Sequence, residues 1–259
     1  VEITLPEGLT SIGSRAFEGC SNLQSLIVNA ITPPSAGIAI LEGSGTVYIY
    51  VPPVSVYAYK SASGWSTYAN SIFSPLVDFF SYADNGDDLT ITKYVGSDTH
   101  VTVPSTINGK PVVEIGTEAF RNNKVLQSVI LPEGLTTVGN YAFYDCTSLV
   151  EITLPEGLAS IGAHAFNRCS GLVEITLPEG LTSIGADAFN RCSGLVEITI
   201  PEGLTSIGTR AFQNCTSLVE ITLPEGLTSI GNYAFAGCTS LVEITLPEGL
   251  TSIGSRAFE

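Results

Sequence analysis

Residues 172–194 read LVEITLPEGLTSIGADAFNRCSG, and this stretch decides the fold. The same letters return with few changes from Leu126 to Glu259, and a partial copy opens the chain at Val1. One phenylalanine recurs every 23 residues, as Phe120, Phe143, Phe166, Phe189, Phe212, Phe235 and Phe258. A fixed period of about 20–50 residues is the signature of a solenoid, in which similar coils stack along one axis.

Each part of the repeat predicts a local structure. Apolar and polar residues alternate around Ile175 and Leu177, which is typical of a half-buried strand. The letters PEG at 178–180 predict a turn, because proline presets its own φ and glycine accepts a positive φ. Residues 184–185 predict a second short extended piece. The inward residues of 188–192, three to four apart, predict one short helical turn.

A single coil of this kind cannot be stable alone. Burying one large aliphatic or phenylalanine side chain contributes roughly 1.5–3 kcal/mol, whereas ordering each residue costs about 1–2 kcal/mol of backbone entropy. Stacking places leucine on leucine and phenylalanine on phenylalanine about 4.8 Å apart, and the sum becomes favourable only over several repeats. We therefore expect a continuous apolar ladder.

The pattern L-x-x-I-x-L-P-x-x-L-x-x-I-G-x-x-A-F-x-x-C, carried by residues 112–259, resembles the BspA-like leucine-rich repeats. This resemblance implies an α/β-type leucine-rich-repeat solenoid, with mainly short parallel strands and one short helical turn per coil. The family is found on surface proteins of anaerobic bacteria and some parasitic protists. It implies a non-enzymatic protein, extracellular or at the cell surface, that acts in adhesion or protein–protein interaction with a host or cell-surface protein.

Two further stretches resemble the end modules of the same family. The letters YVPPVSVYAYKSASGWSTYA at 50–69 resemble its terminating module, and LTITKYVGSDTHVTVPSTINGKPVVEIG at 89–116 resembles its opening module. This order divides the chain into four parts. They are the last repeat of a first solenoid (1–25), a tail capping module (26–76), a junction with a head capping hairpin (77–111) and a second solenoid (112–259).

Local signals add detail to both modules. In the tail module we expect a strand at 46–51 and a helix at 54–68 that is interrupted near Gly64. In the head module we expect strands at 89–93 and 100–103, paired as a hairpin around residues 96–98. Aromatic residues concentrate in the tail module, where they either seal the end of the solenoid or bind a sugar or cofactor. They are Tyr48, Tyr50, Tyr57, Tyr59, Trp65, Tyr68 and Phe73.

The first 18 letters, VEITLPEGLTSIGSRAFE, are identical to residues 242–259. The chain is therefore either one period of a larger tandem protein or a repeat protein that was permuted or trimmed so that its ends match. Solenoid edges with unpaired backbone groups favour association with another copy. We expect head-to-tail contacts that build filaments or rings, a self-assembling structural role that is the alternative to adhesion. The residues expected at these ends are Val1, Ile3, Leu5, Ile253 and Phe258.

Composition excludes some classes of partner. The chain has 25 acidic and 10 basic residues, a net charge of −15, and no sequence cluster of Lys and Arg of the kind that binds nucleic acid or anionic membrane. It contains no apolar run of about 20 residues that could insert into a membrane. Neither a cofactor nor a signal segment is indicated. If the native protein is secreted, we expect this chain to be an excised portion of it.

The six cysteines occupy one repeat position, which Asn123 fills in the first complete copy. We expect a ladder of buried free thiols, because stacked side chains run parallel; disulfides are the alternative, and a zinc site has no C-x-x-C support. These residues are Cys20, Cys146, Cys169, Cys192, Cys215 and Cys238.

Few residues carry catalytic or metal-binding signals. We expect His100 and His164 to be solvated, because neither stands in a spacing that builds a catalytic triad. Residues 83–88, ADNGDD, faintly resemble a calcium loop but lack its final glutamate, so a hairpin or junction turn is the simpler interpretation.

The outward face of the first strand carries the most regular polar pattern. Its candidate partner-binding residues are Glu151, Thr153, Glu174, Thr176, Glu197, Thr199, Glu220, Thr222, Glu243 and Thr245. A second acidic row follows the Pro-Glu-Gly turns, at Glu133, Glu156, Glu179, Glu202, Glu225 and Glu248. Like charges about 5 Å apart in water repel by only roughly 0.8 kcal/mol, so no bound cation is required. The face is either a surface for a basic partner or divalent cations, or a solubilising surface copied by duplication.

Overall fold

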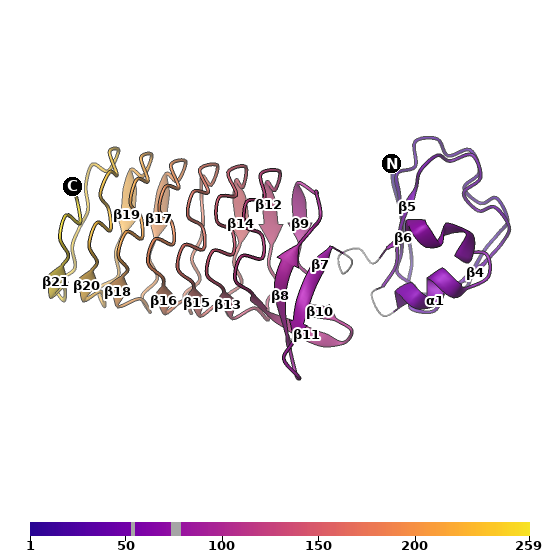
Figure 1. Cartoon of the computed structure of the whole chain (residues 1–259), viewed down its shortest axis with the longest axis horizontal. Helices are drawn as coiled ribbons and strands as arrows, with labels where there is room; N and C mark the ends of the chain where they lie inside the picture. The colour runs from indigo at the N-terminus through magenta and orange to yellow at the C-terminus, as the bar shows by residue number, and fades with distance from the viewer. Residues whose placement is uncertain (53–54, 74–78) are drawn as a thin grey trace. The chain divides into compact units, whose positions relative to one another are not determined.

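The computed structural model describes residues 1–52, 55–73 and 79–259, which form two compact units. The first unit is Val1–Phe79 with Ile107–Gly109, and the second is Phe80–Thr106 with Lys110–Glu259 (Figure 1). The expectations for Val54 and for residues 74–78, and for the side chains of Tyr57 and Phe73, lie outside the described residues. The division into four modules stays a prediction.

The second unit is a solenoid of stacked coils, most of which have two short strands. The row of first strands begins with β9 (His100–Thr102) and continues with β12 (Ser128–Ile130), β14 (Glu151–Thr153), β17 (Glu197–Thr199) and β19 (Glu220–Thr222). The second strands are β11 (Lys110–Ile115), β13 (Thr137–Val138), β15 (Ser160–Ile161), β16 (Ser183–Ile184), β18 (Ser206–Ile207), β20 (Ser229–Ile230) and β21 (Ser252–Ile253). The copies at 174–176 and 243–245 keep the place of a first strand without strand hydrogen bonding.

Equivalent residues of neighbouring coils pair in parallel. Glu197 pairs with Glu220 and Ile198 with Ile221 in β17 and β19, while Ile161 pairs with Ile184 in β15 and β16. The register therefore equals the sequence period, as a ladder requires. This confirms the solenoid of short parallel strands.

The phenylalanines form a continuous column inside the solenoid. The ring centroids of Phe143 and Phe166, and of Phe166 and Phe189, are 5.3 Å apart, and those of Phe189 and Phe212 are 5.4 Å apart. Neighbouring rings are parallel within 7° along this run, and these side chains are fully buried. Such aromatic pairs contribute about 0.5–1.5 kcal/mol beyond the apolar area that they bury.

The expected helical turn is wrong. Between Asp187 and Cys192 every second N–H bonds to the following coil, as in Asp187 to the Thr209 carbonyl (2.9 Å) and Phe189 to the Ala211 carbonyl (2.8 Å). The remaining N–H groups close tight turns three residues back. Apolar spacing alone does not separate these two geometries, because both bring residues three to four apart to one side. The helices whose bounds lie within the described residues, α1 (Val56–Ser61) and the 3₁₀ helix η2 (Ser66–Ser71), belong to the first unit.

The tight turns hold non-glycine residues at positive φ, as at Asp187 (58°) and Arg191 (63°). The Pro-Glu-Gly turn does not use this conformation: Gly180 has no positive φ, and the sequence-based expectation is wrong there. A Cβ on Gly180 would instead lie 3.0 Å from the Glu156 carbonyl oxygen of the preceding coil. Glycine at this position therefore serves close packing of coils.

The predicted hairpin has different partners. β7 (Phe80–Asp84) pairs antiparallel with β8 (Leu89–Tyr94), and the turn passes through Gly86, whose φ is 102°. β8 then pairs with β11, whereas β9 pairs with β12 in register with His100 opposite Ser128. The expected pairing of residues 89–93 with 100–103 is therefore wrong, because these strands join different sheets of the solenoid. The short β10 (Thr106–Ile107) also pairs with β11.

The first unit contains a parallel sheet in the order β1 (Glu2–Leu5), β3 (Ser25–Val28), β5 (Tyr48–Tyr50), β6 (Ile72–Phe73). A second pair joins β2 (Ser11–Ile12) to β4 (Ser35–Ala36). Pairing of Glu2 with Ser25 and of Ser25 with Tyr48 shows that the coil period continues here.

The expected helix at 54–68 is two helices, α1 and η2, separated around Gly64 (φ 80°). Tyr59 and Trp65 are fully buried between the helices and the sheet, with ring centroids 5.0 Å apart. The Tyr59 hydroxyl donates to the Ala30 carbonyl and the Trp65 indole N–H to the Pro34 carbonyl, each at 2.8 Å. Burial raises the pKa of Tyr59 to about 12. These two aromatics belong to the core rather than to a ligand site.

Neighbouring coils approach each other so closely at Gly185 that a larger residue there should destabilise the solenoid. A Cβ there would lie 2.4 Å from the Ala163 amide nitrogen, a backbone atom that cannot move without breaking the ladder. We predict that Gly185→Ala lowers the free energy of unfolding by about 3 kcal/mol or more. The measurement is urea denaturation followed by circular dichroism.

The matched control is Gly226→Ala, where the nearest atom to the new Cβ would be the Glu202 carbonyl oxygen at an ordinary 3.6 Å. Because neither glycine has a positive φ, the control should change stability by less than about 1 kcal/mol. Equal losses in both variants would contradict the packing explanation.

Candidate interaction surfaces

The strand face of the second unit carries the predicted glutamates and threonines. All ten candidate residues are exposed, and they stand in line because the coils stack in register: Glu197 opposite Glu220 and Thr199 opposite Thr222. None of these glutamates has a Lys or Arg within ion-pair distance in the described part of the chain. Their charge is therefore available to a partner.

An exposed valine row runs beside the glutamates, a feature that the sequence analysis missed. Its members are Val125, Val150, Val173, Val196, Val219 and Val242, each at least 41% exposed. A groove of ≈ 600 Å³ lies between two neighbouring coils and is lined by Val150, Glu151, Thr153, Val173 and Glu174. A second groove of ≈ 570 Å³ lies at Val219, Glu220, Val242 and Glu243. The strand face thus combines apolar and acidic groups.

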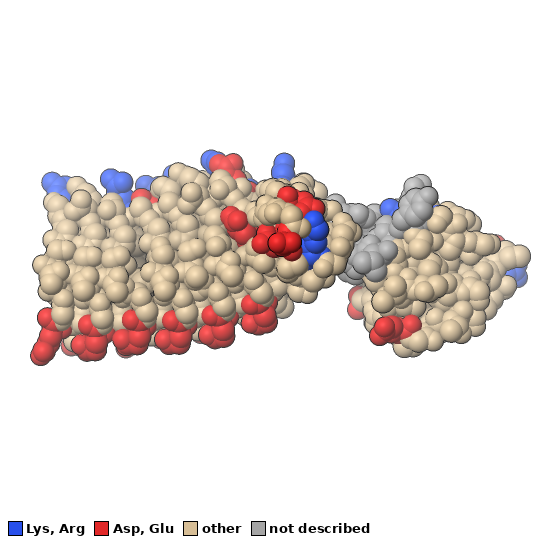
Figure 2. All heavy atoms as spheres, turned by 90° about the horizontal axis from the view of Figure 1, so that it is seen from below, with Lys and Arg blue, Asp and Glu red and all other residues tan. Residues whose placement is uncertain are grey.

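Basic residues gather on the turn face, which consists of the tight-turn segments around Ala-Phe-x-x-Cys. In Figure 2 a row of acidic side chains lines one edge of the second unit, and most of its Lys and Arg lie along the opposite edge, where some acidic side chains are also seen. The basic residues of these segments are Arg121, Lys124, Arg168, Arg191, Arg210 and Arg256. No run of the sequence clusters Lys and Arg, but these residues share one face of the structure because residues 23 apart become neighbours. The exclusion of nucleic acid and anionic membrane stays a prediction.

Several of these cations contact aromatic rings. The Arg121 guanidinium lies 5.1 Å from the Tyr144 ring centroid and 5.6 Å from that of Tyr141. Arg210 and Arg256 lie on the Tyr233 ring at 5.6 and 5.9 Å. The turn face also carries the residues that differ most between repeats, so it is the variable surface of the solenoid.

The five residues expected at self-association ends have mixed exposure. Val1, Ile253 and Phe258 are exposed, whereas Ile3 and Leu5 are half-buried in β1, which pairs with β3. The Phe258 ring stacks on Phe235 with centroids 5.4 Å apart. A groove of ≈ 440 Å³ adjoins Phe235, Val242 and Phe258.

All six cysteines are free thiols, as expected, but only four of them are buried; Cys20 and Cys238 are half-buried. Cys146, Cys169, Cys192 and Cys215 are buried, and each Sγ donates at 3.1 Å to a phenylalanine carbonyl in the preceding coil. Burial raises the pKa of Cys146 to about 12 and that of Cys238 to about 11. It raises the pKa of Cys169, Cys192 and Cys215 well above the ordinary value. The thiols are structural donors and poor nucleophiles.

The two histidines have ordinary surface contacts. His100 is exposed, with Nδ1 2.7 Å from the Ser128 hydroxyl. His164 is half-buried rather than solvated: its ring stacks on Tyr141 with centroids 4.5 Å apart, and its Nδ1 lies 3.1 Å from Asn167 Nδ2.

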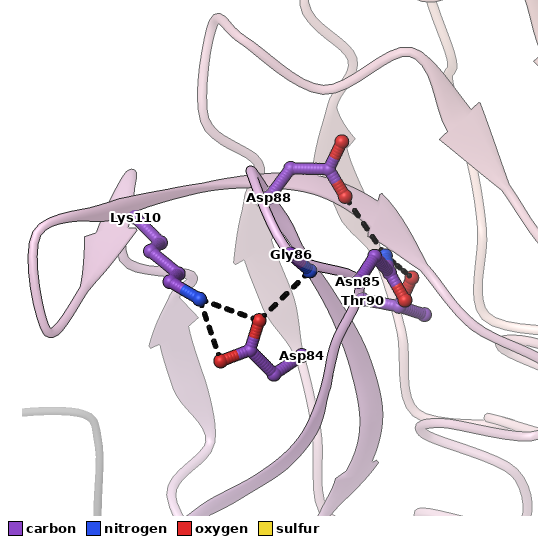
Figure 3. Close-up of polar contacts among 6 residues, drawn as sticks. All are labelled: Asp84, Asn85, Gly86, Asp88, Thr90 and Lys110. Carbon is purple, nitrogen blue, oxygen red and sulfur yellow. Dashed lines mark hydrogen bonds and ion pairs between the residues drawn. The ribbon is translucent and has the colours of Figure 1, made fainter.

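Residues 83–88 form the β7–β8 turn, as the simpler interpretation predicts. The Asp84 carboxylate accepts from Lys110 Nζ at 2.6 and 2.7 Å and from the Gly86 amide at 2.9 Å (Figure 3). The hydrogen bond from Lys110 lowers the pKa of Asp84. Asn85 binds Asp88 and Thr90, so the acidic groups point to separate partners rather than to one centre.

No group of three or more His, Cys, Asp or Glu side chains is arranged to hold a metal ion in the part of the chain that the structure describes. Within the same residues, no helix has the length and apolarity needed to cross a bilayer.

A parallel-stranded repeat solenoid with an apolar ladder defines the class of this protein, and comparison with known proteins specifies the family. The BspA type leucine rich repeat region matches residues 1–43, 97–219 and 160–259 in six copies. The chain belongs to this family of leucine-rich repeat proteins. A search of curated proteins found no match.

Solved structures of bacterial leucine-rich repeat proteins are similar. A Treponema pallidum leucine rich repeat protein is 40% identical over 69% of this chain and 84% of its own, with a TM-score of 0.67. A leucine rich cell surface protein from Faecalibacterium prausnitzii is 38% identical over 72% of this chain and 52% of its own, with a TM-score of 0.66. A Bacteroides ovatus leucine-rich repeat protein is 29% identical over 70% and 55%, with a TM-score of 0.60. The chain thus spans about half the length of the last two.

Because its thiols are buried, the thiol ladder makes the free energy of unfolding depend on pH in the alkaline range. Thiols of the unfolded chain ionise near pH 8.5, whereas the buried thiols keep their protons to higher pH, so above that point the unfolded state binds fewer protons. The free energy of unfolding should be unaffected below about pH 8 and then fall by roughly 1.4 kcal/mol per pH unit for each buried thiol.

Denaturant titrations between about pH 8 and pH 11 measure this slope. Cys192→Ala should lower stability at neutral pH, because it removes the bond to the Phe166 carbonyl. It should also reduce the pH slope by the contribution of one thiol. An unchanged slope would show that Cys192 does not hold its proton in the folded state.

Proposed function

We propose that the chain is a non-enzymatic interaction module of an extracellular or cell-surface protein, and that it mediates adhesion by binding a protein partner. Membership of the BspA type family and similarity to a protein described as a cell surface protein support the location. The arrangement of the strand face supports the mode of action. No cofactor takes part.

The single observation that carries this proposal is the aligned strand face. Exposed valines such as Val173 and Val196 lie beside unpaired glutamates such as Glu174 and Glu197, in register over successive coils. Apolar groups contribute desolvation, and the row of carboxylates attracts basic residues and sets the register. The partner is therefore a protein surface that carries Lys and Arg around apolar residues.

Binding of the fluorescently labelled chain to cultured mammalian cells tests the proposal. Binding should saturate, should be lost after trypsin treatment of the cells, and should weaken at higher salt because exposed charges are screened. The triple variant Glu174→Gln, Glu197→Gln, Glu220→Gln should bind about tenfold more weakly, since three exposed ion pairs contribute about 0.5 kcal/mol each.

The matched control removes the same charge from the other acidic row, outside both strand-face grooves, with Glu133→Gln, Glu179→Gln and Glu202→Gln. These residues are also exposed, so their loss should leave binding nearly unchanged. Equal weakening of both variants would mean that net charge alone drives the attachment. Binding that resists trypsin would contradict a protein receptor.

A second candidate function is head-to-tail self-association, favoured by the identity of residues 1–18 with 242–259. The second copy docks on the preceding coil through Tyr233 N to the Ser255 carbonyl (3.0 Å) and Phe235 N to the Ala257 carbonyl (2.7 Å). Ser14 and Ala16 hold the matching places in the first copy. A first coil from another chain therefore presents the same groups for stacking.

Multi-angle light scattering over a wide concentration range tests this second candidate. Association should grow with concentration, and Ile253→Glu should abolish it by placing a charge at the contact. The control is Ile130→Glu, at an equally exposed isoleucine elsewhere in the solenoid. A monomer at every concentration would refute self-association.

A further inference from the structure

A further groove, of ≈ 500 Å³, lies on the turn face between two columns of stacked residues. One column contains Arg168, Arg191 and Asn214, and the other contains Ser170, Ser193 and Thr216. The buried cysteines of the thiol ladder stand between these columns in the sequence. The groove is therefore lined by cationic and hydroxyl groups above an apolar core.

The backbone fixes the two arginines at the same position of neighbouring coils. Both have a positive φ, 65° at Arg168 and 63° at Arg191. Their N–H groups bond to the next coil at 2.8 Å, Arg168 to the Asn190 carbonyl and Arg191 to that of Gln213. Their Cα atoms are thus about one strand spacing, roughly 4.8 Å, apart.

Neither arginine has a carboxylate partner among the residues that the structure describes, although the Arg168 guanidinium lies 5.8 Å from the Tyr144 ring. Both side chains are exposed. Two adjacent guanidinium groups repel each other, and an oxyanion between them removes that repulsion and accepts forked hydrogen bonds. The hydroxyls of Ser170 and Ser193 offer further donors. The chemistry of this groove selects an oxyanion.

The surrounding charges limit how long that anion can be. One coil before Arg168 the same column contains Asp145, which pairs with Lys124 at 2.6 Å. One coil after Arg191 the column contains the neutral Asn214. Asp187, on the same face, is buried and accepts from Asn190 at 2.6 Å. Within this column positive charge is thus confined to two coils, and a long polyanion that followed the column would meet Asp145.

We propose that this groove is a second partner-binding site, in which Arg168 and Arg191 hold the carboxylates of a short acidic protein segment. It is independent of the strand face: the strand face attracts basic groups, whereas the turn-face groove attracts acidic ones. The two surfaces allow one solenoid to contact two partners of opposite charge.

Fluorescence anisotropy with a labelled Gly-Glu-Glu-Gly-Glu-Glu-Gly peptide tests the site at an ionic strength of about 0.15 M, where the Debye length is roughly 8 Å. The double variant Arg168→Gln, Arg191→Gln should raise the dissociation constant at least about tenfold, because the bidentate contacts are lost. Ser170→Glu should block the groove with a carboxylate while both arginines remain, which separates occupancy from any effect of the arginines on folding.

The control is Arg210→Gln with Arg256→Gln, which removes the same charge from the same face outside the groove. It should change the dissociation constant by no more than about twofold, because screened charges at a distance contribute little. Equal weakening in both double variants, or no binding of the peptide to the unmodified chain, would overturn the site. Tighter, Arg168-dependent binding of a sulfated oligosaccharide or single-stranded DNA would overturn the choice of ligand.

Discussion

Everything in this protein depends on the contact between one coil and the next. In the second unit, backbone N–H groups of each strand and each tight turn bond to a neighbouring coil, as Phe189 does to Ala211, while the phenylalanine rings stack beneath them. Neither interaction exists within a single coil. Stability therefore comes from repetition, and each residue type is selected for how well it stacks on itself.

This constraint explains the residues that do not vary. Glycine at the position of Gly185 leaves room for the backbone of the preceding coil, and the cysteine position suits a small side chain that donates to a carbonyl under the phenylalanine column. The same constraint fixes the backbone where side chains do vary. Tight-turn residues such as Arg191 accept a positive φ, because the hydrogen bonds to neighbouring coils hold them there.

Stacking also converts sequence spacing into surface chemistry. Residues 23 apart lie side by side, so a glutamate on the strand face becomes an acidic row and two arginines on the turn face become a pair. The acidic row and the arginine pair lie on different faces because they occupy different positions of the coil (Figure 2). The acidic row of the strand face is thereby kept apart from the arginine pair of the turn face, and this separation underlies both of the proposed binding surfaces.

The repeat by itself determined the solenoid, the parallel register, the phenylalanine column, the free thiols and the exposed Glu and Thr rows, because a fixed period places equivalent residues on one another. Only the tertiary structure decided that the segment from Asp187 to Cys192 forms tight turns and no helix, since the alternation of hydrogen bonds between coils has no signature in apolar spacing. It also decided that β8 and β9 join different sheets, because partners far away in the sequence outcompete the local hairpin. The valine row and the pair of Arg168 and Arg191 emerged only in space, where side-chain exposure and the meeting of distant residues are settled by packing.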